Sequence, residues 1–154
     1  VRNRIRQGIF DPKDFTQESY ALVSCFQALE HVHDPLLVSR GAYSLLKKGG
    51  MYFTVSHNYR GGVNKILGTK SPIYDIEHLQ LFSPDSITAL MKQAGFSDIR
   101  VFPIWNSYPL HYWIKLFPMP KGLKRGVIKG LKAVRLAGIP LAAPVGNMGV
   151  IATK

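Results

Sequence analysis

The feature that most constrains the fold is a strand–helix–strand pattern in the first third of the chain. Residues 20–26 read Tyr-Ala-Leu-Val-Ser-Cys-Phe, a nearly continuous apolar run typical of a strand buried on both faces of a parallel sheet. Asp34-Pro35 then supplies an N-cap and a first-turn proline for a helix, which Gly49-Gly50 ends. Residues 51–56 form the next apolar run. The connection is long enough for a right-handed crossover, so we expect two parallel neighbouring strands with the helix across one face.

Turn and cap signals divide the next part of the chain into further elements. Residues 57–82 are rich in turn signals and predict an irregular lid with at most a short helix. Residues 83–85 (Ser-Pro-Asp) begin a second helix, which Gly95 ends. A third strand lies within residues 96–104, and the last strand is expected at residues 148–153.

Residues 105–146, between the last two strands, differ from the rest in composition. Their first part interleaves Trp, Tyr, Phe and Pro. In residues 121–135, six cations fall within an arc of about 140° on a helical wheel, with Leu and Val on the opposite side. These cations are Lys121, Lys124, Arg125, Lys129, Lys132 and Arg135. The pattern predicts a basic amphipathic helix, weakened by Gly126 and Gly130.

Charge is distributed unevenly along the chain. The 154 residues carry a net charge of +11, yet residues 99–154 contain Lys and Arg and neither Asp nor Glu. Such a basic patch suggests nucleic acid, anionic lipid or an acidic substrate as partner, with a solvated helix face as the structural alternative. The aromatic and cationic residues stand in consecutive blocks, which favours a membrane surface or a lipid-linked acceptor over nucleic acid.

Composition bounds the class and the compartment. Hydrophobic residues make up 46% of the chain and charged residues 19%, which argues against disorder. Cys25 is the single cysteine, so we expect no internal disulfide and a reducing, cytoplasmic location, peripheral to a membrane if the basic helix binds one. The longest uncharged stretch, residues 136–153, is interrupted by Pro140 and Pro144 and does not predict a transmembrane helix.

Four motifs in the first two thirds of the chain resemble one known family. They are Leu-Glu-His-Val-His-Asp-Pro at residues 29–35, Leu-Leu-Lys-Lys-Gly-Gly at 45–50, His-Leu-Gln-Leu-Phe-Ser-Pro at 78–84 and Ala-Gly-Phe at 94–96. In this order they resemble the class I S-adenosylmethionine-dependent methyltransferases, over residues 7–104. The resemblance implies an α/β fold, namely the C-terminal part of a Rossmann-like doubly wound sheet. That sheet is mostly parallel, with an antiparallel last strand near the strand after Phe96.

The resemblance also implies an organisation into segments. Residues 1–104 are then the C-terminal part of a methyltransferase-like α/β domain, residues 105–146 an aromatic and basic insertion, and residues 147–154 the last strand of the same sheet. The family's Gly-x-Gly-x-Gly cofactor turn and acidic ribose ligand are absent, and about sixty residues or more would be needed to hold them. Because these features are missing, we expect either a fragment or a half that has lost the activity. The chain alone is expected to bind S-adenosylmethionine weakly.

Two short segments are implied to meet the cofactor, S-adenosylmethionine. Ile9-Phe10-Asp11 matches the segment that contacts the adenine ring, with an ordinary core aromatic as the alternative for Phe10. Residues 8–12 also predict a short strand leading into a turn. Cys25-Phe26-Gln27 leaves the carboxyl end of a strand, where open α/β sheets bind ligands, and Gln27 would bond the methionine end.

Two histidines are candidates for a general base. His57 follows the second strand and His78 lies at the end of the lid, with a loop or helix-start contact as the alternative for each. For Glu30 and His31 we expect local hydrogen bonds ahead of the Asp34 helix cap rather than catalysis. The run of residues 31–34 (His-Val-His-Asp) lacks a shared helix face and a further ligand set, so no metal is expected.

Two functional classes remain open on the sequence. The first is an S-adenosylmethionine-dependent methyltransferase, present as a fragment, that methylates a small-molecule or lipid-linked acceptor. The second is a non-catalytic binding module that uses its basic face for an anionic membrane or a nucleic acid.

Overall fold

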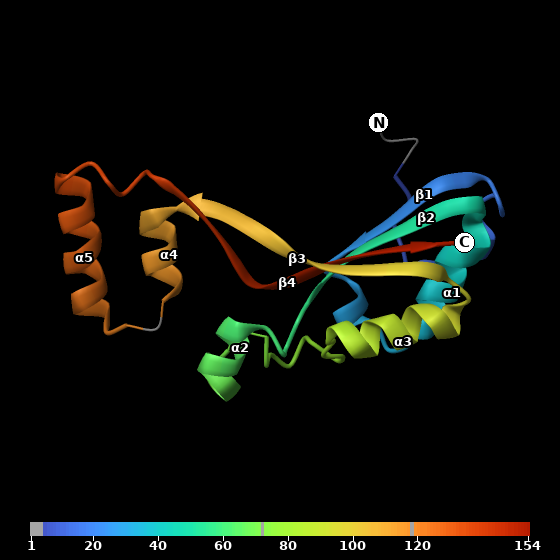
Figure 1. Cartoon of the computed structure of the whole chain (residues 1–154), viewed down its shortest axis with the longest axis horizontal. Coiled ribbons are helices and arrows are strands. Elements are labelled where there is room, and N and C mark those ends of the chain that lie inside the picture. Colours follow the sequence, from blue (N-terminus) through green and yellow to red (C-terminus); the bar gives the residue numbers. More distant parts are fainter. Residues whose placement is uncertain (1–4, 72, 118) are drawn as a thin grey trace. The chain divides into compact units, whose positions relative to one another are not determined.

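The computed structural model describes residues 5–71, 73–117 and 119–154 (Figure 1). Its first elements in chain order are η2 (Pro12–Asp14), β1 (Tyr20–Phe26), η3 (Leu29–His31), α1 (Pro35–Leu45), β2 (Leu46–His57) and α2 (Gly62–Leu67). They are followed by η4 (Gly68–Lys70), α3 (Pro84–Ala94), β3 (Ser97–Pro109), α4 (Leu110–Leu116), α5 (Lys121–Ala133) and β4 (Pro140–Thr153). The predicted α/β class is confirmed, and the described part of the lid carries the short α-helix α2, as expected, followed directly by the 3-10 helix η4.

The four strands form one mixed sheet in the order β1-β2-β4-β3. β1 and β2 are parallel neighbours, with Val23 opposite Tyr52, as the crossover predicted. β4 runs antiparallel to β2 and lies between β2 and β3, which confirms the antiparallel last strand next to the strand after Phe96. A Cβ added to Gly149 of β4 would lie 2.7 Å from the Phe102 ring of β3, so this glycine permits the close approach of the two strands.

The prediction that Gly49-Gly50 ends the helix is wrong, because the pair lies inside β2. α1 stops earlier, at Leu45. Gly49 has φ +75°, a left-handed conformation that favours glycine, and a Cβ on Gly50 would lie 3.0 Å from the carbonyl oxygen of Tyr20. The pair therefore lets β2 begin at Leu46, directly after the helix and tight against β1.

Helices α1 and α3 lie on the same side of the sheet (Figure 1), and both begin where the cap signals predict. The Asp34 carboxylate accepts a hydrogen bond from the Leu37 backbone N–H at 2.9 Å. The Ser83 hydroxyl accepts one from the Ser86 backbone N–H at 3.2 Å, and Gly95, with φ +105°, ends α3. These caps satisfy backbone groups that a helix end otherwise leaves free.

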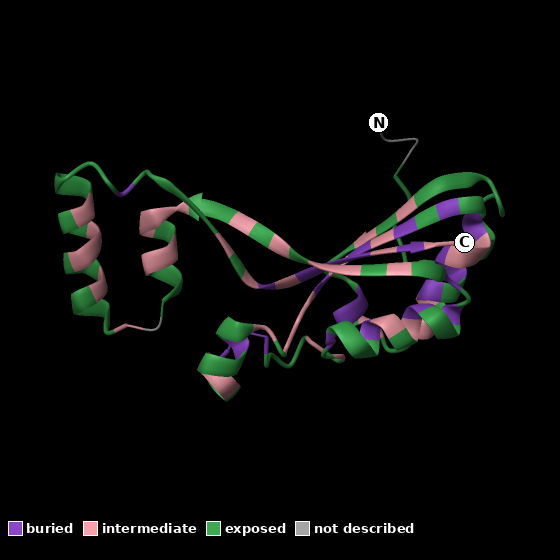
Figure 2. Ribbon diagram, viewed as in Figure 1, coloured by how far each residue is buried: buried purple, intermediate pink, exposed green. Residues whose placement is uncertain are grey.

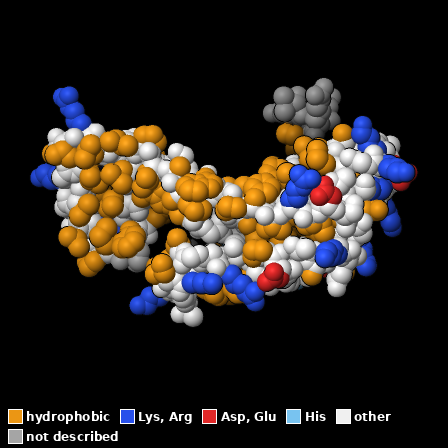
Figure 3. All heavy atoms as spheres, viewed as in Figure 1, with side chains coloured by type: hydrophobic (Ala, Val, Ile, Leu, Met, Phe, Trp, Pro, Cys, Tyr) orange, Lys and Arg blue, Asp and Glu red, His pale blue; other side chains and the backbone are white. Residues whose placement is uncertain are grey.

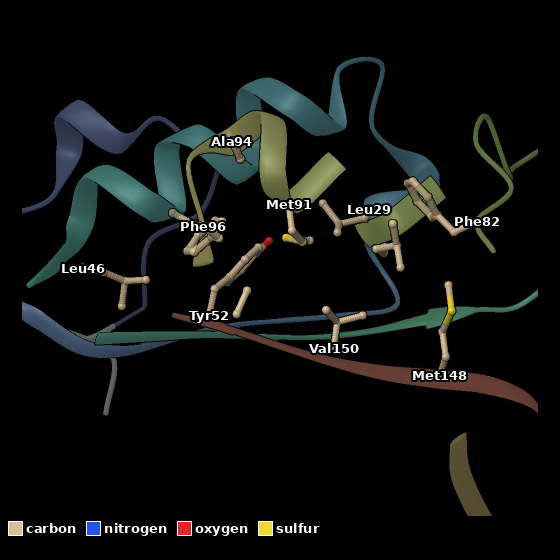
Figure 4. Packing of buried hydrophobic residues seen from close by; sticks show 12 residues of the cluster. Leu29, Leu46, Tyr52, Phe82, Met91, Ala94, Phe96, Met148 and Val150 are labelled. Carbon is tan, nitrogen blue, oxygen red and sulfur yellow. The ribbon is translucent and has the colours of Figure 1, made fainter. Parts of the chain in front are cut away.

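The hydrophobic core lies between these two helices and the inner face of the sheet (Figure 4). The rings of Tyr52 and Phe96 stack with their centroids 5.4 Å apart, and Ile87 and Met91 of α3 are fully buried. Burying an aliphatic or aromatic side chain of this size contributes about 1.5–3 kcal/mol. This layer therefore holds β1, β2 and β4 in register below the helices.

Strand β1 is not buried on both faces, contrary to the prediction. Because α1 and α3 cover only one face of the sheet, Tyr20, Leu22 and Phe26 remain exposed on the other (Figure 2). β1 is also an edge strand of the described sheet. Within the apolar run of β1, Val23 and Cys25 are the residues that pack against the core on the side covered by the helices.

The short strand predicted at residues 8–12 is wrong. These residues form a bend and the start of η2, and the Asp11 carboxylate accepts the Lys13 backbone N–H at 2.9 Å. A strand needs a hydrogen-bonding partner, and no described strand pairs with this segment. The segment packs against α1 instead: a Cβ on Gly41 would lie 2.9 Å from the Phe10 ring.

The chain divides into two compact units. One comprises Val1–Ile104 and Gly146–Lys154, and the other comprises Trp105–Val145. The predicted basic helix is confirmed as α5, although Arg135 lies beyond its end with φ +58°. Residues 136–153 belong mostly to β4, and no helix in the described ranges is long and apolar enough to span a bilayer.

The second unit is held together by contacts between its own elements. α4 and α5 pack on each other, and the Lys124 ammonium donates to the Lys115 carbonyl oxygen at 2.7 Å. The Trp113 indole N–H donates to the Leu141 carbonyl oxygen at 2.8 Å. Only Ala137 is buried among the described residues of this unit, so it has almost no hydrophobic core of its own.

Candidate active site

A buried carboxylate is the centre of the candidate site. Glu30 lies in η3, directly after β1, and its side chain is fully buried. Its Oε1 accepts hydrogen bonds from the His57 backbone N–H at 2.7 Å and from His57 Nδ1 at 3.1 Å. The expectation of local hydrogen bonds near the Asp34 cap is therefore wrong for Glu30. Its partner comes from the end of another strand because β1 and β2 are parallel and their carboxyl ends meet.

Two further histidines lie beside this pair. The His78 ring is 5.2 Å from the His57 ring and 4.8 Å from the His31 ring, measured between centroids. His31 Nδ1 lies 2.8 Å from the Glu77 carbonyl oxygen, which is again a long-range contact rather than the local one expected. The fold thus brings together His57 and His78, the two candidate bases, at one edge of the sheet.

Two atoms of this cluster are buried without a hydrogen-bond partner among the described residues. They are Oε2 of Glu30 and Nδ1 of His78. Leaving a buried polar atom unpaired costs about 1–3 kcal/mol, and more for a charged group. Such atoms are typical of a site that a substrate or ordered water completes.

Electrostatics favour an ionised Glu30. Burial alone raises the pKa of Glu30, but the hydrogen bonds from the His57 ring and backbone N–H outweigh it and hold the pKa below its usual value. An ionised carboxylate only accepts hydrogen bonds, so Nδ1 of His57 carries a proton. In the neutral ring the lone pair is then on Nε2, on the side away from Glu30.

Of the predicted cofactor residues here, Cys25 and Phe26 are the last two residues of β1, and Gln27 lies in the turn between β1 and η3. Gln27 adopts a left-handed backbone with φ +50°, and its N–H donates to the Val55 carbonyl oxygen at 2.8 Å. Phe26 is exposed and meets the Phe53 ring edge-on at 5.4 Å. Burial raises the pKa of the Cys25 thiol, and the Tyr52 hydroxyl offsets this only in part, so Cys25 stays a neutral thiol.

The other predicted cofactor segment, Ile9-Phe10-Asp11, is attached to α1. Ile9 is 98% exposed, whereas Phe10 packs over Gly41 and lies 6.0 Å from the Phe15 ring. The Asp11 carboxylate is engaged as the cap of η2. In this segment, the Ile9 side chain and part of the Phe10 ring are therefore exposed to solvent.

Sequence reasoning missed the burial of Glu30 and its pairing with His57. The available signal was its position directly after an apolar strand and beside a leucine, where an acidic side chain needs a partner to be buried. The identity of that partner depended on the pairing of β1 with β2. Within the described part of the chain, no group of three or more His, Cys, Asp or Glu side chains is arranged to hold a metal ion.

Two parallel strands joined through a crossover helix, with a polar cluster at their carboxyl ends, define an α/β fold of the Rossmann-like class. A family described as "Methyltransferase domain" matches residues 2–101. The chain belongs to this family, the class I methyltransferases whose cofactor is S-adenosylmethionine.

Solved structures share the fold. A methyltransferase from Thermotoga maritima, titled a possible histamine N-methyltransferase, matches with a TM-score of 0.57 and 20% identity over 91% of this chain and 58% of its own. A methyltransferase from Archaeoglobus fulgidus matches with a TM-score of 0.57 and 17% identity, over 93% of this chain and 63% of its own.

Curated relatives are somewhat more similar in sequence. An Aliivibrio fischeri protein named ubiquinone biosynthesis O-methyltransferase is 28% identical over 105 residues, covering 60% of this chain and 45% of the relative. A Shewanella protein of the same name is 32% identical over 82 residues, covering 49% of this chain and 35% of the relative. The chain spans about half the length of the first curated relatives that it matches.

Proposed function

We propose that this chain forms the acceptor side of an S-adenosylmethionine-dependent O-methyltransferase, in which His57 is the general base. Glu30 is the positioning residue for that base. The observation that carries the proposal is the buried Glu30 carboxylate bonded to Nδ1 of His57 at the carboxyl ends of β1 and β2. A non-catalytic module would have no need of this pair, since burying a carboxylate is costly.

The proposed chemistry assigns one task to each residue. When bound, S-adenosylmethionine supplies a methyl group on a positively charged sulfur, which is released as a neutral thioether. His57 Nε2 takes the proton of the acceptor hydroxyl as the oxygen–methyl bond forms. Glu30 holds the ring orientation and stabilises the imidazolium that results. His78, packed edge-on against His57, bounds the acceptor side of the ring.

The cofactor residues fit in part. Exposed Ile9 and half-exposed Phe10 suit the flat apolar surface of adenine, and the exposed Gln27 amide suits the polar methionine end. Cys25 and Phe26 end strand β1 directly before Gln27, and Asp11 follows Phe10. The 154 residues contain no Gly-x-Gly-x-Gly turn, so we expect the chain alone to bind the cofactor weakly. Calorimetry that finds low-micromolar binding by this chain would contradict that expectation.

The acceptor is proposed to be a hydroxyl on a small molecule or on a lipid-linked ring. Support comes from the relatives named ubiquinone biosynthesis O-methyltransferase, because ubiquinone carries an isoprenoid tail. The general base fits oxygen acceptors, whose proton must leave as the methyl group arrives.

The test is methyl transfer from labelled S-adenosylmethionine to a catechol bearing a short isoprenoid tail, by the complete protein. We expect His57→Gln to lower kcat by about 10²–10⁴-fold, the usual contribution of a general base. Cofactor affinity should stay unchanged in this variant, since His57 acts on the acceptor. His33→Gln is the matched control, because His33 is an exposed histidine of the same unit, and should retain wild-type kcat.

Two results separate the roles of the residues. Glu30→Gln should lower kcat and shift the pH range over which the reaction rate rises. If Glu30 were purely structural, the substitution would change stability and leave this pH–rate profile unchanged. Full activity of His57→Gln, or no methyl transfer to any phenolic or alcoholic acceptor by the wild type, would overturn the proposal.

A further inference from the structure

We propose that the unit of residues 105–145 binds the surface of an anionic lipid bilayer. This unit is distinct in sequence from the Glu30–His57 site, and the proposal does not rest on the proposed methyl transfer. Two independent properties of the unit carry it: an unbalanced positive charge and an exposed apolar surface.

The charge of this unit has no internal compensation. Residues 105–145 contain seven Lys and Arg and neither Asp nor Glu. No salt bridge is formed by any described residue of the unit. One side-chain hydrogen bond from its described cations is present, from Lys124, and its acceptor is the uncharged backbone carbonyl oxygen of Lys115. A surface of this kind attracts phosphate-bearing headgroups, and each cation near such a surface contributes about 1 kcal/mol.

The cations of α5 differ in solvent exposure. Lys121, Arg125, Lys129 and Lys132 are exposed and fall within an arc of about 80° on the helix. Lys124, in contrast, is half-buried and donates to the Lys115 carbonyl oxygen of α4. The sequence had grouped six cations on this face. Lys124 is turned toward α4 and Arg135 lies beyond the end of α5, so the exposed basic face of the helix itself comprises four residues.

The same unit exposes large hydrophobic side chains. They are Trp105, Tyr108, Tyr112, Leu116, Phe117, Leu123, Val134, Leu136, Ile139 and Leu141. Figure 3 shows hydrophobic side chains over much of the viewed face of this unit, with Lys and Arg at its margin. Exposed apolar surface next to cations is the composition of an interfacial element that lies at the level of the headgroups.

The apolar side chains favour a bilayer over the other occupants. Single-stranded nucleic acid stacks on aromatic rings, whereas most of these side chains, such as Leu116, Leu123 and Ile139, are aliphatic. A second copy of this unit would bring seven further cations against the first, with no acid to pair them. Aromatic residues such as Trp105 and Tyr108 are the type enriched at the membrane–water boundary.

Sedimentation with vesicles tests the proposal on the complete protein. We expect the protein to bind vesicles of phosphatidylcholine that contain about a third phosphatidylglycerol, and to bind pure phosphatidylcholine vesicles only weakly. Binding to the anionic vesicles should decrease as the salt concentration rises. The triple variant Arg125→Gln/Lys129→Gln/Lys132→Gln should bind on the order of a hundredfold more weakly. Leu116→Asn/Leu123→Asn should weaken binding by about tenfold or more, since both side chains would enter the headgroup layer.

The matched control is Lys47→Gln/Lys48→Gln/Lys92→Gln, which removes the same charge from exposed positions of the other unit. It should bind the anionic vesicles within about threefold of the wild type, the spread expected for screened distant charges. Equal weakening by both triple variants would mean that net charge alone acts and would overturn the proposal. Vesicle binding by neither wild type nor control, or binding of a single-stranded oligonucleotide in place of vesicles, would overturn it as well.

Discussion

The two units of this chain are stabilised in different ways. In the unit of residues 1–104 and 146–154, buried side chains of α1, α3 and the sheet form a continuous core, and caps fix both helices. In the unit of residues 105–145, only Ala137 is buried among the described residues, and neither α4 nor α5 has a side-chain cap. Pro109 and Pro120 stand at those cap positions instead.

The first unit holds particular side chains in fixed positions, whereas the second exposes side chains at its surface. The first unit can hold Glu30 and His57 at hydrogen-bonding distance because η3, which carries Glu30, follows β1, and His57 ends β2, the parallel neighbour of β1. The second unit keeps its hydrophobic and basic side chains at the surface, where they are open to a partner rather than used for folding. The two proposals thus assign catalysis and surface binding to different parts of the chain.

The largest effect should come from removing core volume. Ile87→Ala, at a fully buried position of α3, should destabilise the first unit by about 2–5 kcal/mol, the usual cost of a large-to-small core change. Leu123→Ala, at a side chain that is 58% exposed, should change stability by about 0.5 kcal/mol or less. Urea unfolding followed by far-UV circular dichroism measures both.

Tryptophan fluorescence shows whether the units are independent. Trp105 and Trp113 are the two tryptophans of the chain, and both belong to the second unit. If Ile87→Ala shifts the fluorescence midpoint as much as the circular dichroism midpoint, the two units unfold together and the comparison fails.

A smaller effect is expected from the buried carboxylate. Glu30→Gln keeps the shape but loses charge-assisted hydrogen bonds, and should cost about 1.5–3 kcal/mol at neutral pH. Because the pKa of Glu30 is lowered in the folded chain, its contribution is fully present above the usual value of 4.5 and is lost as pH falls through the lower, folded value. Wild type and variant should therefore converge in stability in acid.

Glu77→Gln is the control for that measurement, since Glu77 is an exposed acid in the lid. Its stability should follow the wild type over the same pH range. A gap between Glu30→Gln and wild type that stays constant into acid would show that the carboxylate charge does not carry the effect.

The smallest effect should arise in the second unit. Gly126 and Gly130 lie in α5, and a Cβ added at either meets no atom within 4 Å. Gly126→Ala and Gly130→Ala should each stabilise α5 by about 0.4–1 kcal/mol and increase the helical signal at 222 nm.

Gly95→Ala provides the opposite case in the first unit. Gly95 has φ +105° and its Cβ would lie 3.4 Å from the Tyr43 ring, so alanine should destabilise the chain. A loss of helical signal in Gly126→Ala would contradict the view that α5 is limited by its glycines.

Local patterns in the sequence determined the elements and their order. The Asp34 and Ser83 caps, the apolar runs of β1 and β2 and the basic spacing of α5 all depend on neighbours within a few residues, which a sequence displays directly. The parallel pairing of β1 with β2 followed from the length of their connection.

Tertiary structure alone decided which side chains meet. Glu30 and His57 stand far apart in sequence and come together because parallel strands end at the same edge. The exposure of β1 depended on which face the helices cover, and the turning of Lys124 toward α4 depended on helix packing. Such contacts are set by the burial of surfaces from distant segments, and no local pattern contains that information.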